Sequence, residues 1–300
     1  MRSIQLLKER SAIKLFRFGA VGQEKPGVID NAGVLRDLSG VICDWDQSTI
    51  ADSAVLKSLR EMNFEGLPAV AAGQRLGAPV AVTGKLICIG YNSKLHAKQM
   101  GEQLTESSEP VVFLKANSSV CGPNDPILHN RYTKKLDWEG ELTVVVGRKG
   151  KYIPPGSAGG YILGYMCGQD LSERYWQFET NDKQYTKGKS FDNFAPLGPF
   201  LATADEIEDP AGLHAVLTVN GITRQDFYTS DYIHSPADII SYLSKFFTLY
   251  PGDVILLGSP PGNAKSWGGD CWLKPGDRVE FGISGLGKQC QAVIDEQDIL

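Results

Sequence analysis

The chain has 300 residues, of which 42% are hydrophobic and 22% charged, and its formal net charge is −5. This composition is typical of a globular protein with one large domain or two unequal ones. The lack of a basic cluster argues against nucleic acid as a partner, and no apolar run is long enough to cross a membrane. The six scattered cysteines, without a C-x-x-C pair, and the mixed charges of the N-terminus predict a cytoplasmic protein with free thiols.

The N-terminal segment contains three short alternating or apolar runs, at 13–18, 26–30 and 34–38. Turn residues separate these runs, so the pattern predicts a small β-meander. Apolar residues at helical spacing then predict a helix from Thr49 to Met62. A Gly/Ala/Pro-rich stretch follows from Gly66 to Pro79. We therefore predict a small N-terminal α/β domain over residues 1–78 and a larger domain over residues 79–300.

The larger domain is predicted to consist mostly of short strands. Its apolar runs are 86–90, 110–114, 143–146, 162–167, 214–219, 254–257 and 278–283. A Pro-Gly-Asp turn precedes each of the last two runs, as expected where strands fold back in a roll or barrel. Helices are predicted from near Leu171 and behind the N-cap and proline pair Ser235-Pro236. The sequence thus predicts an α+β protein, mostly β, built on bent antiparallel sheets.

The most informative segment is the run D-W-E-G-E-L-T-V-V-V, in which Glu139 and Glu141 stand two positions apart before a β-branched strand. Successive side chains of a strand point to opposite faces, so these two carboxylates emerge on the same side. Like charges this close repel each other unless a cation lies between them, and Mg²⁺ is a hard cation that takes oxygen ligands. The alternative interpretation is the solvated face of an edge strand.

Other polar segments accompany the strands, and together they form a family pattern. The motifs, in chain order, are I-G-Y-N-x₃-H-A, F-L-K, D-W-E-x-E-L, Q-D-x-S-E-R-x-W-Q, G-K-S-F-D-x-F-x-P-L-G-P and P-G-D-V-I-x-x-G-S-P-P-G. With them the chain resembles the fumarylacetoacetate hydrolase family over roughly residues 84–290. The N-terminal turns resemble its bacterial two-domain branch, which includes 2,4-diketo-3-deoxy-L-rhamnonate and fuconate hydrolases and ureidoglycolate lyase-like proteins.

The resemblance implies a catalytic domain that is a mixed β-roll or sandwich, and a homodimer. It also implies that Glu139, Glu141 and Asp170 bind Mg²⁺, with Mn²⁺ as the alternative. Three carboxylates leave half of an octahedral Mg²⁺ shell free for water and substrate, so the chemistry of these residues agrees with this assignment.

The resemblance further implies a set of substrate contacts. Lys189 is expected to hold the carboxylate and enolate charge of the substrate. Arg174 and Gln177, three positions apart on the predicted helix, share one face and are expected to contact the substrate. Ser259, where relatives carry Thr, and Lys115 of the F-L-K motif complete the predicted contacts. The structural alternatives are a solvated lysine, a helix surface and ordinary turn chemistry.

His96 matches the family histidine that activates a water molecule. In relatives a glutamate follows it by three residues, whereas this chain has Gln99. An amide can orient an imidazole but does not stabilise the imidazolium as a carboxylate does. Glu102, Glu106 and Glu109 are candidates to supply the missing carboxylate.

We therefore predict a Mg²⁺-dependent hydrolase that cleaves a carbon–carbon bond in a 2,4-dioxo acid, either an acylpyruvate or a diketo-deoxy sugar acid. The metal and Lys189 would hold the resulting enolate. Because Gln99 weakens the water-activating pair, the alternative is a lyase, decarboxylase, dehydratase or isomerase of a 2-oxo acid, such as oxaloacetate decarboxylation or ureidoglycolate cleavage. A third hypothesis is a metal-binding pseudoenzyme. Two further departures, Gln169 and Asn263-Ala264, predict a substrate pocket unlike that of the commonest members.

Overall fold

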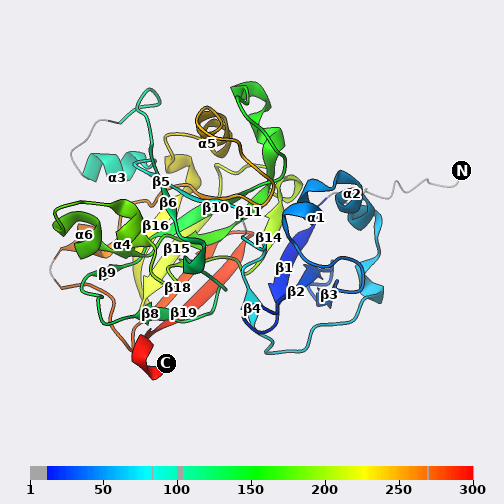
Figure 1. Ribbon diagram of the computed structural model, residues 1–300, viewed down its shortest axis with the longest axis horizontal. Helices are drawn as coiled ribbons and strands as arrows, with labels where there is room; N and C mark the ends of the chain where they lie inside the picture. Colours follow the sequence, from blue (N-terminus) through cyan, green and yellow to red (C-terminus); the bar gives the residue numbers. More distant parts are fainter. Residues whose placement is uncertain (1–11, 83, 100–103, 269, 300) are drawn as a thin grey trace, which may run out of the picture.

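Two packed β-sheets form the framework of the protein, with short helices around them (Figure 1). The computed structural model describes residues 12–82, 84–99, 104–268 and 270–299. Within these residues, ten strands form the larger sheet in the order β3-β2-β1-β14-β11-β10-β17-β5-β6, with β4 paired to β1. They are β1 (Lys14–Phe18), β2 (Lys25–Ile29), β3 (Leu35–Asp37), β4 (Leu76–Gly77), β5 (Leu86–Gly90), β6 (Val111–Lys115), β10 (Gly140–Val146), β11 (Ile162–Gln169), β14 (Leu201–Thr203) and β17 (Val254–Leu256).

A smaller five-stranded sheet, in the order β16-β15-β18-β19-β8, packs on one face of the larger sheet. Its strands are β8 (Ile127–His129), β15 (His214–Val219), β16 (Ile222–Tyr228), β18 (Arg278–Ile283) and β19 (Gly287–Asp295). Two short pairs are β9 (Leu136–Asp137) with β12 (Ser172–Glu173) and β7 (Val120–Cys121) with β13 (Ala195–Pro196). The mostly-β, α+β prediction is confirmed, and no closed barrel forms in the described part of the chain.

The α-helices of the described residues are short. They are α1 (Gln47–Ala51), α2 (Ser53–Glu61), α3 (Lys94–Gln99), α4 (Tyr185–Lys189), α5 (Pro236–Leu243) and α6 (Ala264–Trp267). One π-helical turn is η4 (Tyr175–Glu179), and the 3₁₀ turns are η1 (Phe64–Gly66), η2 (Asn117–Ser119), η3 (Pro155–Tyr161), η5 (Ala204–Glu206), η6 (Thr229–Asp231) and η7 (Glu296–Asp298). α5 begins as predicted, because Ser235 and Asp238 form a capping box around Pro236.

The central strands β5, β10, β11 and β17 of the larger sheet are buried on both faces, which explains why their sequences are mostly apolar. In β10, Leu142 and Val144 lie in the core between the two sheets, together with Phe281 of β18. Val145 points to the opposite face and packs in a second core with Ile50 of α1. Burying one such side chain stabilises a fold by roughly 1.5–3 kcal/mol, so the two cores hold β10 firmly in place.

The N-terminal strands extend the same sheet. β1 pairs antiparallel with β14, where Lys14 lies opposite Ala202. Next to this pair, the backbone N–H of Ile13 donates to Thr203 Oγ1 at 2.9 Å. β1, β2 and β3 are therefore continuous with the strands that carry the acidic motif. A domain boundary between residues 78 and 79 stays a prediction.

Several elements differ from the sequence-based predictions. The helix expected over 49–62 is interrupted at Asp52, whose carboxylate accepts the N–H groups of Ala54 and Val55 and so starts α2. The helix expected from Leu171 is instead β12 followed by η4. The predictions contain neither β16 nor β19, because both strands mix buried positions with exposed polar ones.

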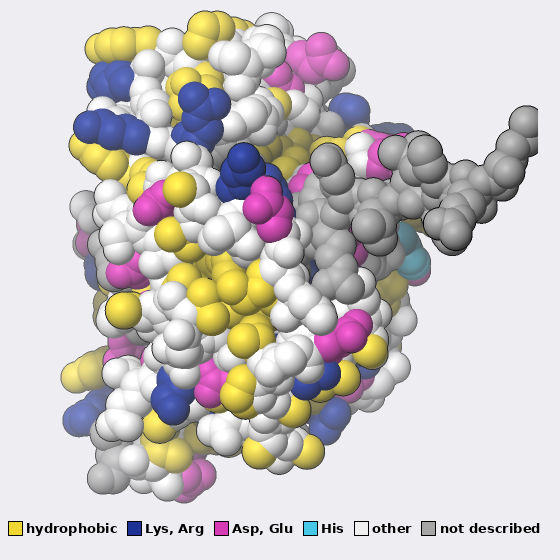
Figure 2. All heavy atoms as spheres, turned by 90° about the vertical axis from the view of Figure 1, so that its right-hand side faces the viewer, with side chains coloured by type: hydrophobic (Ala, Val, Ile, Leu, Met, Phe, Trp, Pro, Cys, Tyr) yellow, Lys and Arg dark blue, Asp and Glu magenta, His cyan; other side chains and the backbone are white. Residues whose placement is uncertain are grey.

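No helix among the described residues combines the length and apolar character needed to span a membrane. All six cysteines lie in the described residues and are free thiols, as predicted. On the face at the right of Figure 1, basic and acidic side chains are interspersed around a hydrophobic patch (Figure 2). The absence of a nucleic-acid partner, the homodimer and the cytoplasmic location stay predictions.

Candidate active site

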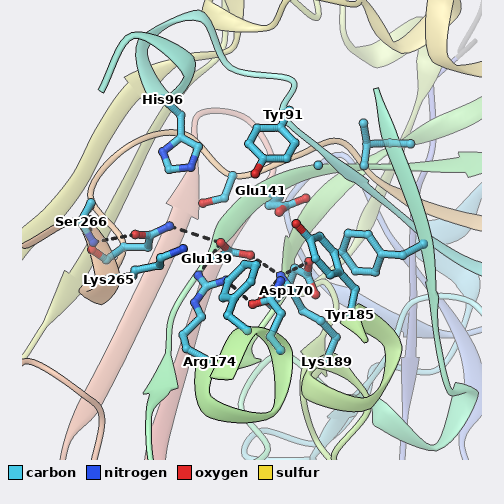
Figure 3. A pocket seen from close by; sticks show the side chains of 17 residues that line it. Tyr91, His96, Glu139, Glu141, Asp170, Arg174, Tyr185, Lys189, Lys265 and Ser266 are labelled. Carbon is cyan, nitrogen blue, oxygen red and sulfur yellow. Dashed lines mark hydrogen bonds and ion pairs between the residues drawn. The ribbon is translucent and has the colours of Figure 1, made fainter. Parts of the chain in front are cut away.

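A cavity lies at the edge of the larger sheet where four strand ends meet (Figure 3). β10 runs antiparallel to β11 and β17, and β17 runs parallel to β5. The start of β10 therefore lies beside the ends of the other three strands. Glu139, Asp170, Tyr91 and Ser259 follow or precede these ends and line one cavity of about 730 Å³, counting its open mouth.

Three acidic side chains, Glu139, Glu141 and Asp170, converge in this cavity. One oxygen atom from each lies within 4.8 Å of the other two. The two glutamates lie on the same side of the strand, as their spacing predicts. Asp170 is held beside them because its N–H donates to the Glu139 carbonyl at 2.9 Å. The three residues are buried, with exposed fractions of 7%, 1% and 1%.

Protein groups neutralise this triad only in part. Glu141 accepts a hydrogen bond from the Gly258 N–H at 2.7 Å and has no cationic partner within ion-pair distance among the described residues. Burial, and then repulsion from Asp170 and Glu139, raise the pKa of Glu141 well above its usual range. Burial also raises the pKa of Glu139. The buried cations Arg174 and Lys189 outweigh this effect and hold the pKa of Glu139 well below its usual range.

This donor set fits a divalent metal ion. Carboxylate oxygens are the hard ligands that Mg²⁺ and Mn²⁺ prefer, and three of them leave coordination positions for water and substrate. The carboxylate of Glu141 forms no ion pair among the described residues, so its charge is the one that a bound ion would stabilise most. The triad is therefore able to hold a metal ion, and the identity of the ion belongs to the proposal below.

Lys189, which the family resemblance assigns to the site, lies between two members of the triad. Its ammonium donates to Glu139 Oε2 at 2.5 Å and to Asp170 Oδ2 at 2.6 Å. Burial lowers the pKa of Lys189, but these carboxylates outweigh burial and raise it, so the side chain stays charged. Gly188 permits this position, because a Cβ there would lie 2.7 Å from the backbone N of Gln177. α4 therefore packs directly on η4.

Lys115 is buried behind Asp170 rather than in the cavity wall. Its ammonium donates to Asp170 Oδ1 at 2.7 Å, to the Phe194 carbonyl at 2.6 Å and to the Leu171 carbonyl at 3.2 Å. Alternation along β6 exposes Leu114 and turns Lys115 inward. All three ammonium donors are used. The position of Lys115 therefore does not support the predicted contact with the substrate. Lys115 instead orients Asp170.

Arg174 and Gln177 form a bonded pair in the cavity wall. Arg174 Nη1 donates to Gln177 Oε1 at 2.9 Å, so their spacing brings them together as predicted, although the backbone there is a π-helical turn. The guanidinium also donates to Asp137 Oδ2 at 2.7 Å and to Glu139 Oε1 at 2.5 Å. Arg174 is therefore engaged by two carboxylates and fixes the orientation of Glu139.

Ser259 lies in the turn that follows β17 and lines the cavity. Its hydroxyl accepts a hydrogen bond from Gln225 Nε2 and donates to the Pro260 carbonyl, each at 3.1 Å. Gln225 also accepts the Gly140 N–H at 2.9 Å, which ties this turn to the start of β10. The position of Ser259 agrees with the predicted substrate contact, which stays a prediction.

His96 projects from α3 across the cavity from Glu139 (Figure 3). Its Nδ1 is buried and has no hydrogen-bond partner among the described residues. Burial is the main influence and lowers the pKa of His96, while Glu139 raises it. Repulsion from Arg174 and Lys265 lowers the pKa of His96 further, and the side-chain amide of Gln99 raises it by a smaller amount. The net result is an imidazole that is neutral at pH 7.

The described carboxylates do not replace the glutamate that relatives pair with this histidine. Glu109 accepts a hydrogen bond from the Tyr242 hydroxyl at 2.8 Å, and Glu106 lines a separate surface groove. Glu102 lies outside the described residues. His96 therefore faces the cavity with the amide of Gln99 on its own helix and no acidic partner in the part of the chain that the structure describes.

The cavity wall also contains residues that the sequence did not single out. Tyr91 has a left-handed backbone, with φ +58°, directly after β5. Burial first, and then Tyr91, raise the pKa of Tyr185 to about 12. The other wall residues to which the sequence analysis gave no role are Ile89, Gly90, Phe113, Phe178, Lys265 and Ser266, and Asn263 also lines the cavity. The one sequence signal for them is the departure from the family pattern at Asn263.

Fold and site together define a class: an enzyme scaffold of two packed sheets with a carboxylate site suited to a divalent metal. Residues 85–294 match the family described as fumarylacetoacetate (FAA) hydrolase, C-terminal. A protein of Burkholderia cenocepacia (strain HI2424), whose name assigns it provisionally to the hydrolases, is 43% identical over 286 residues, which cover 95% of this chain and 100% of that protein. The chain belongs to the fumarylacetoacetate hydrolase family, and its branch within the family stays a prediction.

Two solved structures illustrate the range of chemistry on this fold. The 2-hydroxyhepta-2,4-diene-1,7-dioate isomerase from Mycobacterium marinum is 30% identical, with a TM-score of 0.74, over 95% of this chain and 99% of that chain. The maleylpyruvate hydrolase from Sphingobium sp. SYK-6, in complex with manganese(II) ion and pyruvate, is 26% identical, with a TM-score of 0.78, over 94% of this chain and 99% of that chain. Similarity alone therefore does not choose between a hydrolase and an isomerase.

Proposed function

We propose that this protein is a Mg²⁺-dependent hydrolase that cleaves a carbon–carbon bond in a 2,4-dioxo acid, with Mn²⁺ as an alternative ion. The observation that carries the proposal is the convergence of Glu139, Glu141 and Asp170 in one cavity with Lys189 between two of them. The similar hydrolase that contains manganese(II) ion and pyruvate supports it.

The acidic triad and four other residues of the cavity have distinct parts in this reaction. A divalent ion held by the triad would polarise the 2-oxo group and stabilise the negative charge that bond cleavage leaves behind. His96, neutral at pH 7, takes a proton from the water that attacks the 4-carbonyl. The bond between C3 and C4 then breaks, C4 leaves as a carboxylic acid, and C3 takes back a proton. Lys189 holds the enolate charge, while Gln177 and Ser259 orient the substrate.

Turnover of a substrate panel with Mg²⁺ is the direct test. Acylpyruvates and 2,4-diketo-3-deoxy acids are expected to yield pyruvate or its hydroxylated analogue, with one carboxylic acid released for each. The release is followed by coupled pyruvate detection and by NMR. If metal binds but no panel member is cleaved, hydrolysis is rejected. If substrate analogues bind under those conditions without any chemistry, the pseudoenzyme hypothesis is favoured.

A second candidate function is isomerisation or decarboxylation of a 2-oxo acid, which needs no activated water. One observation favours it: the buried Nδ1 of His96 has no carboxylate partner among the described residues, and Gln99 stands in the expected position. Similarity to a diene-dioate isomerase supports the same chemistry. Oxaloacetate and an unsaturated 2-hydroxy diacid therefore belong in the same panel.

The Gln99→Glu variant separates these two candidates by its pH profile. Burial lowers the pKa of His96 below 6.5, so the acid limb of kcat/KM for hydrolysis is expected below pH 6.5. A glutamate at position 99 favours the imidazolium, raises this pKa and moves the limb to higher pH. If the native enzyme is a hydrolase, the variant still hydrolyses its substrate, and the acid limb of its kcat/KM profile lies at higher pH. If acylpyruvate hydrolysis appears only in the variant, the native reaction is the second candidate.

A further inference from the structure

The backbone at Lys265, a residue of the cavity wall, is held beside the acidic triad by hydrogen bonds to two buried carboxylates. Asp137, which accepts from Arg174, also accepts the backbone N–H groups of Ala264 at 2.6 Å and of Lys265 at 3.2 Å. Asn263 Nδ2 donates to Glu139 Oε1 at 3.3 Å. The first turn of α6 is thus fixed relative to the acidic triad, and so is the base of the Lys265 side chain.

The ammonium of Lys265 differs from the other cations of the site. Lys115, Arg174 and Lys189 are buried and each bonds one or two carboxylates. Lys265 is exposed at the mouth, and no carboxylate of the described residues lies within ion-pair distance of it. Its ammonium lies 3.9 Å from the centre of the Phe178 ring and points into the cavity toward Glu139 (Figure 3).

The charge balance of the site shows what such a cation is suited to. The triad Glu139, Glu141 and Asp170, the cations Lys115, Arg174 and Lys189 that pair with it, and Asp137, which shares Arg174, comprise four carboxylates and three cations. Glu173 is also buried, but it accepts only backbone N–H groups and is not part of this network. One negative charge is left over. A divalent ion turns this balance to one positive charge, which a single carboxylate neutralises. Lys265 adds a second positive charge, so a ligand with two negative charges is needed to neutralise the loaded cavity.

We propose that Lys265 binds a second anionic group of the substrate, and that the substrate is therefore a 2-oxo acid with a further carboxylate at its far end. This inference rests on the proposed function, because the first carboxylate and the 2-oxo group are assigned to the metal end of the cavity. The contact with Phe178 orients the ammonium. Burial, followed by repulsion from Arg174, lowers the pKa of Lys265, and an anion bound beside the ammonium would favour its charged form. A distal carboxylate supplies that anion.

Calorimetric binding of non-reacting ligand pairs tests the subsite without turnover. The pairs are 2-oxoglutarate with 2-oxopentanoate and 2-oxoadipate with 2-oxohexanoate, each matched in chain length and measured with saturating Mg²⁺ at low salt. In the wild-type protein the better-fitting diacid is expected to bind about five- to tenfold more tightly than its matched monoacid. Higher ionic strength reduces this preference because the mouth of the cavity is exposed.

The Lys265→Met variant is expected to bring the ratio of the two affinities close to one, while binding of the monoacid stays unchanged. Lys265→Arg should keep the preference, and so should Lys274→Met, which removes an exposed lysine outside the cavity. No diacid preference in the wild type, or a preference that survives in Lys265→Met, overturns the subsite and leaves the proposed function standing. If no ligand binds with Mg²⁺ present, the proposed function fails at the metal end, and the subsite fails with it.

Discussion

The Glu141→Gln variant is expected to lose metal binding while its metal-free form stays at least as stable as the wild type. Glu141 is 1% exposed, and its hydrogen-bond donor is the Gly258 N–H, which an amide oxygen accepts equally well. The substitution also removes one of three close negative charges. Turnover should fall by about 10³-fold, because a first ligand of the metal supports several kcal/mol of charge stabilisation.

Thermal unfolding with and without Mg²⁺ checks this expectation. The wild type should gain a Tm increase with Mg²⁺, since a ligand that binds only the folded state stabilises it. The variant should show no such increase and an unchanged or higher metal-free Tm. Glu208→Gln, which changes an exposed carboxylate elsewhere, is the matched control and should behave as the wild type. A Mg²⁺ response retained in Glu141→Gln would falsify the assignment of this residue as a ligand.

The Lys189→Met variant is expected to destabilise the metal-free protein, in contrast to Glu141→Gln. It leaves the carboxylates of Glu139 and Asp170 buried side by side without the cation that lies between them. Breaking such a buried pair typically destabilises a fold by about 3–5 kcal/mol, which corresponds to a Tm decrease of roughly 10 °C. Saturating Mg²⁺ should restore part of this loss, because a second cation takes over the charge, but it should not restore turnover.

Lys187→Met is a matched control for this experiment, two residues away on the same helix. Lys187 is paired with Asp182 at 2.5 Å, but both side chains are more than 40% exposed. Exposed ion pairs contribute little, so its Tm should change by no more than about 2 °C. Equal Tm changes in the two lysine variants would show that the buried position of Lys189 has no special role in the charge balance.

Glu139 and Glu141 are the part of the site that the residue pattern alone could reach, whereas Asp170, Lys189 and His96 were assigned by the family resemblance. Glu139 and Glu141 share a side of the strand because side chains alternate, and that rule needs no tertiary information. Lys115 shows the limit of the approach. The F-L-K motif gives the residue type, but whether the ammonium enters the cavity or lies behind Asp170 depends on which face of β6 is buried.

Other features depend on contacts that only the folded chain makes. Asp52 ends one helix and caps the next, so a continuous apolar pattern became two short helices. Lys265 enters the cavity wall because Asp137, more than a hundred positions earlier, accepts its backbone N–H. The alternating exposed and buried positions of β16 conceal its role as a strand. Local patterns carried little information about these three features.

The pairing of β1 with β14 has a consequence for biosynthesis. The bond between Ile13 and Thr203 spans 190 positions, so the first strands leave the ribosome long before their neighbour exists. Until then the nascent hairpin has an open edge and an uncovered apolar face. Contacts this distant slow folding, so the growing chain must be kept from aggregation while translation proceeds. A truncated chain that ended before β14 would keep this open strand edge and uncovered apolar face.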